Sequence, residues 1–93
     1  MYRGEYRTKS GRSTFKFYYE QQSGGAIRVY ITQQPSYGSR ATDAHSTHRY
    51  GVGAQPYICF GTDPTALQDA ITFSKSWAEL TERYILTGRD HNS

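Results

Sequence analysis

The C-terminal segment TDPTALQDAITFSKSWAELTERYILTG, residues 62–88, constrains the fold more than any other part of this chain. Asp63 can cap the N-terminus of a helix, because aspartate is favoured at that position. Pro64 can then occupy the first helical position, where its missing N–H needs no partner. Gly88 is the residue type that most often ends a helix. Advancing by about 100° per residue, the apolar side chains cover about half of the circumference. The segment therefore predicts one long amphipathic helix over about 64–87.

Two earlier segments instead alternate apolar and polar residues with period two. They are TFKFYYE at 14–20 and AIRVYITQ at 26–33. This alternation, in aromatic and β-branched residues, predicts two half-buried strands. The glycines between them suit a hairpin turn. PYICF at 56–60 predicts a further short strand, and residues 2–8 or 47–52 are additional candidates.

Strands followed by one long helix predict an α+β fold, in which an antiparallel sheet of three to four strands packs on the helix. A chain of 93 residues is the size of a single domain, here 1–93 with a frayed tail at 89–93. The alternation also predicts which side chains face the helix. They are Phe15, Phe17, Tyr19, Ile27, Val29, Ile31, Ile58 and Phe60.

Cysteine content and apolar runs indicate the cellular compartment. Cys59 is the single cysteine, so an internal disulfide is excluded. No apolar run approaches the ~20 residues that span a bilayer, and the N-terminal residues lack an apolar signal core. We therefore expect a soluble cytoplasmic protein with no membrane partner and no cofactor.

The sheet face turned away from the helix is the first candidate site. It should present Lys16, Tyr18, Arg28 and Tyr30 together, with Tyr57 as a candidate beside them. Residues 1–50 contain eight Lys and Arg against three Asp and Glu, so positive charge is concentrated in this half of the chain. Basic and aromatic side chains on an exposed sheet can neutralise phosphates and stack on bases, which predicts nucleic-acid binding as an alternative function. Ordinary pairing on solvated strands would give the same composition.

The segment 34–56, punctuated by proline and glycine, is too long for a simple connection, and such loops are often functional. Its stretch TDAHSTHRY at 42–50 brings Asp43, His45 and His48 close in sequence. A zinc site there is disfavoured, because neither an HExxH pattern nor a cysteine pair is present.

Acid–base chemistry is a second interpretation of the same loop. Imidazole titrates near neutrality, so His45 or His48 could transfer protons while Arg40 and Arg49 stabilise phosphate charge. A small histidine-dependent phosphodiesterase is therefore a second alternative function. No nucleophile-elbow context surrounds the loop serines, and the sequence favours a protein that is not an enzyme.

A contact surface is the preferred interpretation of the loop, because tyrosine and arginine dominate interface hot spots. The residues expected to bind a protein partner are Tyr37, Arg40, His45, His48, Arg49 and Tyr50.

The resulting hypothesis is a non-enzymatic interaction protein that docks on a larger, nucleic-acid-handling assembly and modulates or inhibits it. A small α+β domain with no catalytic signature is similar in kind to phage or mobile-element inhibitors, although no motif is shared. The apolar arc of the helix is wide, so a homodimer through the flank Phe73, Leu80 and Tyr84 is a further hypothesis.

Overall fold

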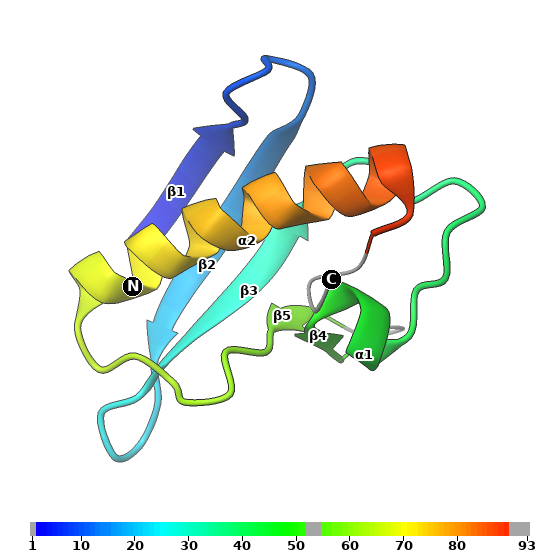
Figure 1. Cartoon of the computed structure of the whole chain (residues 1–93). Coiled ribbons are helices and arrows are strands. Elements are labelled where there is room, and N and C mark those ends of the chain that lie inside the picture. The colour runs from blue at the N-terminus through cyan, green and yellow to red at the C-terminus, as the bar shows by residue number, and fades with distance from the viewer. Residues whose placement is uncertain (1, 52–54, 90–93) are drawn as a thin grey trace.

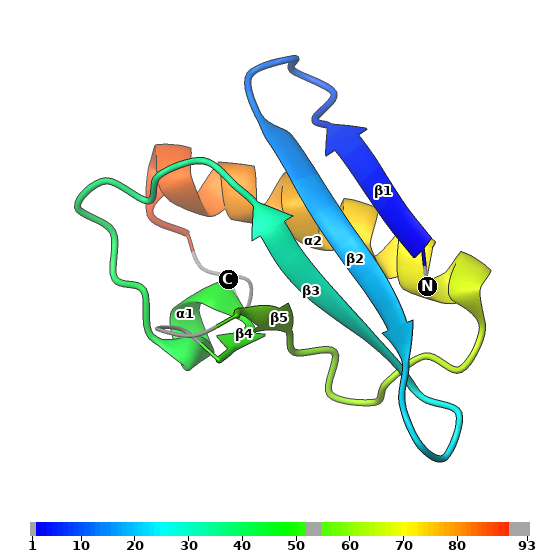
Figure 2. The same ribbon diagram turned by 180° about the vertical axis from the view of Figure 1, so that it is seen from behind.

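The computed structural model describes residues 2–51 and 55–89. In chain order the elements are β1 (Tyr2–Arg7), β2 (Thr14–Gln21), β3 (Ile27–Gln33), α1 (Ala44–Thr47), β4 (Arg49–Tyr50), β5 (Tyr57–Ile58) and α2 (Leu67–Thr87). Helix α2 crosses one face of the sheet (Figure 1). Seen from behind, β1, β2 and β3 lie in front of α2, and none of the described elements covers their outer face (Figure 2).

The five strands form one antiparallel sheet in the order β1-β2-β3-β5-β4. The predicted α+β arrangement is confirmed, with five strands in place of three to four. Both additional candidates contain a strand, β1 within 2–8 and β4 within 47–52. The last residue of the second candidate lies outside the described residues. Part of the predicted tail, residues 90–93, also lies outside them.

A tight turn joins β2 to β3, as the glycines predicted. The Gln22 N–H donates to the Ala26 carbonyl at 2.7 Å. Gly24 and Gly25 both have positive φ, at 95° and 97°. Because side-chain-bearing residues rarely adopt this conformation, the two glycines allow the chain to reverse here.

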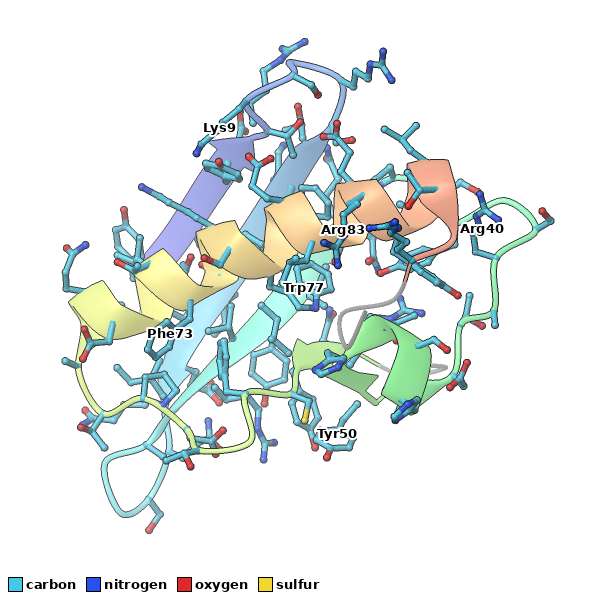
Figure 3. All side chains as sticks on the ribbon, viewed as in Figure 1. Lys9, Arg40, Tyr50, Phe73, Trp77 and Arg83 are labelled. Carbon is cyan, nitrogen blue, oxygen red and sulfur yellow. The ribbon has the colours of Figure 1, made fainter. Side chains whose placement is uncertain are left out.

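The core lies between α2 and the inner face of the sheet. Trp77 is at its centre, with the rings of Phe15 and Phe17 edge-on to the indole at centroid distances of 5.6 and 6.1 Å. Figure 3 shows Trp77 beside the middle of α2. The predicted inward-facing set is buried except for Phe60, which is half-buried and packs beside Phe73 at 5.9 Å.

The start of α2 differs from the prediction, although its end does not. The helix begins at Leu67, and its N-cap is Ala66, which makes no side-chain capping bond. The Pro64 carbonyl accepts a hydrogen bond from the Ile27 N–H at 2.8 Å, which holds the chain against the start of β3 and delays the helix. At the other end, Gly88 adopts the left-handed conformation as predicted.

The buried stripe of α2 is narrower and more polar than its apolar arc. It consists of Ala70, Ser74, Trp77, Ala78, Thr81, Glu82 and Tyr84. Ser74 is there because its hydroxyl hydrogen-bonds that of Tyr19 at 2.6 Å. Glu82, although charged, belongs to this stripe and accepts a hydrogen bond from the Ser10 hydroxyl at 2.5 Å.

One residue of the proposed dimer flank, Tyr84, belongs to this buried stripe. Tyr84 is buried, and its hydroxyl donates to the Ala41 carbonyl at 2.6 Å, so it packs within its own chain. Its expected place on an exposed flank is therefore wrong. Phe73 is exposed and Leu80 half-buried. A homodimer remains a prediction, resting on these two residues.

Candidate nucleic-acid interface

Two of the six residues expected to contact a partner are buried in the chain itself. The Arg49 guanidinium lies over the Tyr37 ring at 4.4 Å, and its Nε donates to the Thr47 hydroxyl at 3.1 Å. Burial raises the pKa of Tyr37 to about 12, although Arg49 opposes the shift. Arg49 and Tyr37 therefore stabilise the fold, which corrects the expectation that they form an exposed contact surface.

Arg40 has a structural contact as well. Its Nε donates to the Ile85 carbonyl at 3.1 Å and its Nη2 to the Leu86 carbonyl at 3.3 Å. The last carbonyls of a helix lack partners within the helix and carry partial negative charge. Arg40 thus caps the C-terminus of α2, beside which it lies in Figure 3.

The histidines belong to the short helix α1 and its end. Asp43 caps this helix by accepting a hydrogen bond from the Ser46 N–H at 3.1 Å, and its bonds with Ser46 lower the pKa of the carboxyl. His45 and His48 line a shallow hollow of about 220 Å³ with Ala44, Tyr50 and Cys59, and no carboxylate is among its lining residues.

The described ranges 2–51 and 55–89 contain no group of three or more His, Cys, Asp or Glu side chains placed to hold a metal ion. Among these same residues, no helix combines the length and apolar character needed to cross a membrane.

The outer face of the sheet carries a row of four tyrosines, one from each of four neighbouring strands. Successive ring centroids are 6.3 Å apart from Tyr18 to Tyr30, 6.0 Å from Tyr30 to Tyr57 and 5.7 Å from Tyr57 to Tyr50. Strand pairing places them in register, because Tyr18 opposes Tyr30, Tyr30 opposes Tyr57, and Tyr57 opposes Tyr50. Tyr50 is 48% exposed. We call these four residues the tyrosine row.

Two arginines lie on the tyrosine row. The Arg3 guanidinium is 5.0 Å from the centroid of the Tyr18 ring, and that of Arg28 is 4.2 Å from the centroid of Tyr57. Both distances are within the range of cation–π attraction. The two cations are therefore held on the aromatic surface, where they can meet an anion that lies along it.

The rest of this face is polar. Following the strand register outward from the buried positions, the other side chains on it are Glu5, Arg7, Thr14, Lys16, Glu20 and Thr32. Lys16 forms an exposed ion pair with Glu5 at 4.0 Å. With Arg3 and Arg28 included, four cations face two carboxylates, so the face carries a net positive charge.

The sequence pattern identified Lys16, Tyr18, Arg28 and Tyr30 on this face, and the structure places them there together. The pattern offered Tyr57 as a candidate beside them, but it did not show that Tyr50 extends the row further, because β4 and β5 have two residues each. Alternation cannot be recognised in segments that short. Arg3 was missed as a partner of Tyr18 for a similar reason, since only the β1–β2 register sets them opposite each other.

Comparison with known proteins gives no information on the function of this site. No protein-family model, no curated protein and no solved structure matches this chain.

Proposed function

We propose that this chain is a non-enzymatic protein that binds single-stranded nucleic acid on the outer face of its sheet. The observation that carries the proposal is the tyrosine row with Arg3 and Arg28 lying over two of its rings. Bases stack on such rings whatever their sequence, while cations beside them neutralise the phosphates. The two requirements are met on one continuous surface.

The shape of this surface favours a single strand over a duplex. Unstacked bases can lie on aromatic side chains, whereas bases within a duplex are already stacked on one another. The major groove of a duplex is read by a helix or a two-stranded β-ribbon that enters it. The described part of the sheet face carries no such projection (Figure 2). A shallow hollow of about 450 Å³ beside Arg3, Tyr18 and Tyr30 gives a base access to the first half of the row.

Docking on a larger protein assembly remains a prediction, now with fewer exposed residues to support it. Tyr37 and Arg49 are buried and Arg40 caps a helix, so Tyr50 and the two histidines are what the loop offers a partner. Tyr50 also belongs to the tyrosine row, so one surface would serve either ligand.

Fluorescence anisotropy with labelled oligouridine and oligothymidine of about eight nucleotides, within the usual site size of such surfaces, tests the proposal. Tyr18→Ala and Tyr30→Ala should each weaken binding about tenfold, because each removes one stacking partner. Phe73→Ala is the matched control, since it removes an exposed aromatic ring from the helix side of the molecule.

Circular dichroism of each variant would show that the fold is retained. If neither oligonucleotide binds at low salt, or if Phe73→Ala weakens binding as much as the tyrosine variants do, the proposal is wrong. The open face would then be left to a protein partner.

A further inference from the structure

The tyrosine row ends at a hollow beside β5 that differs in character from the rest of the sheet face. Its volume is about 220 Å³, and its lining includes Arg28, Tyr50, Tyr57, Cys59 and Asp63. Ile58, Phe60 and Gly61 complete the lining. We call it the Asp63 hollow. Figure 3 shows Tyr50 at this edge of the molecule, away from α2.

One side of the Asp63 hollow is a flat stack of an arginine on an aromatic ring. The Arg28 guanidinium lies 4.2 Å from the Tyr57 ring centroid. The nearby Tyr30 hydroxyl raises the pKa of Arg28, against the opposing effect of partial burial. The Tyr57 ring covers one side of the guanidinium, and its other planar surface is of the kind on which nucleobases stack.

Asp63 supplies a negative charge to an otherwise basic surface. It is exposed and lines the hollow together with Arg28 and Tyr50. The helix pattern assigned it to capping α2, but Ala66 holds that position. Among the described residues it accepts no hydrogen bond, so both carboxylate oxygens remain available to a ligand.

We infer that the Asp63 hollow takes one guanine base of the strand, with Asp63 accepting hydrogen bonds from its Watson–Crick edge. The inference rests on the proposed function and specifies the ligand of the same surface. In this arrangement the base stacks against Arg28 and Tyr50, while Asp63 receives the guanine N1–H and one N2–H. The remainder of the row binds the neighbouring nucleotides without regard to sequence.

Guanine is the base whose Watson–Crick edge fits a carboxylate. It presents two adjacent N–H donors, which match the two acceptor oxygens of an ionised aspartate. Adenine and cytosine place a ring-nitrogen acceptor beside their amino group, and uracil flanks its N–H with two carbonyl oxygens. Each of these would set an acceptor against the carboxylate, which is unfavourable.

The experiment compares an oligouridine of about eight nucleotides with the same oligomer carrying one central guanosine. Wild-type protein should bind the guanosine oligomer about fivefold tighter, at the lower end of the range for a two-bond base contact because Asp63 is exposed. Inosine, which lacks the N2 amino group, should lose most of this gain.

Asp63→Ala and Asp63→Asn should abolish the preference while leaving the affinity for oligouridine unchanged or higher. Asp69→Asn is the matched control, because it removes an exposed aspartate six positions further along the chain and should keep the preference. Equal affinity of the wild type for the two oligomers, or a guanosine preference that survives both Asp63 variants, would overturn the inference and leave the proposed function intact. If neither oligomer binds, both fail together.

Discussion

The indole N–H of Trp77 donates a hydrogen bond to the Thr47 carbonyl across 3.0 Å, which joins the middle of α2 to the end of α1 thirty positions earlier. Thr47 is fully buried, and Arg49 holds its hydroxyl. This junction fixes the point at which the chain leaves α1 and enters β4. Tyr50 reaches the tyrosine row from there, so a core contact on the helix side positions a residue on the opposite side of the sheet.

Replacing Trp77 with phenylalanine tests the junction. The variant keeps an aromatic ring but removes the donor and leaves a buried carbonyl without its partner. We expect a loss of about 2 kcal/mol in the free energy of unfolding, from the lost hydrogen bond and the smaller side chain together. Urea unfolding followed by circular dichroism measures it. Ser76→Ala, at an exposed neighbouring position, should change stability by no more than about 0.5 kcal/mol. Equal stabilities of wild type and Trp77→Phe would contradict this role.

Gly88 and Gly61 form a natural pair for testing the cap that Arg40 provides. Both have a φ of 79°, so alanine is strained equally at either position. At Gly88 an added Cβ would lie 2.9 Å from Arg40 Nη1, whereas at Gly61 nothing lies within 4 Å. Gly61→Ala should cost about 1 kcal/mol from the backbone alone. Gly88→Ala should cost about 1 kcal/mol more, because Arg40 must leave the helix carbonyls. Equal losses in thermal or urea unfolding would show that Arg40 contributes nothing there.

The parts of this fold that the sequence revealed are those in which a pattern repeats several times. Phe15, Phe17 and Tyr19 alternate over enough residues to fix the inner face of β2, and Val29 and Ile31 do so for β3. The end of α2 was visible at Gly88 because a left-handed cap strongly favours glycine. In each case a local preference and the tertiary contacts agree.

The features of the fold that the sequence did not reveal depend on contacts between residues distant in sequence. Asp63 and Pro64 have the composition of a helix start, but pairing of the Pro64 carbonyl with Ile27 holds that chain extended. Glu82 is buried although it is charged, and the Ser10 hydroxyl of the β1–β2 loop donates a hydrogen bond to it. Arg49 was expected at the surface for its charge, but its partners Tyr37 and Thr47 lie in the core. No short-range pattern carries this information.

We expect the buried carboxyl of Glu82 to make the folded protein less stable in acid. Burial raises the pKa of its carboxyl, but the nearby hydroxyls of Ser10, Thr8 and Ser13 and the charge of Arg12 together outweigh burial, so the pKa lies below its ordinary value of 4.5. A depressed folded-state pKa means that the stabilisation is fully present above about 4.5 and is lost as pH falls through the folded-state pKa.

The stability difference between wild type and Glu82→Gln should therefore be constant near neutrality and shrink below pH 4.5. Urea unfolding at a series of pH values measures it. Ser10→Ala removes one donor to the carboxylate and should reduce the same pH dependence in part. A Glu82→Gln variant as sensitive to acid as the wild type would exclude Glu82 as the group responsible.

The salt dependence of binding provides an independent test of the outer sheet face. For single strands, each phosphate that the protein neutralises contributes about 0.7 to the slope of log affinity against log salt. Arg3 lies over Tyr18 on this face, so Arg3→Gln should reduce the slope by about that amount. Lys75 lies near Tyr6 on the helix side, at 6.0 Å from the ring centroid, and Lys75→Gln removes the same charge without touching the row. For Lys75→Gln, the slope of log affinity against log salt should match that of the wild type. If the two variants lowered the slope equally, the strand would be attracted by net charge alone, and the tyrosine row would have no part in placing it.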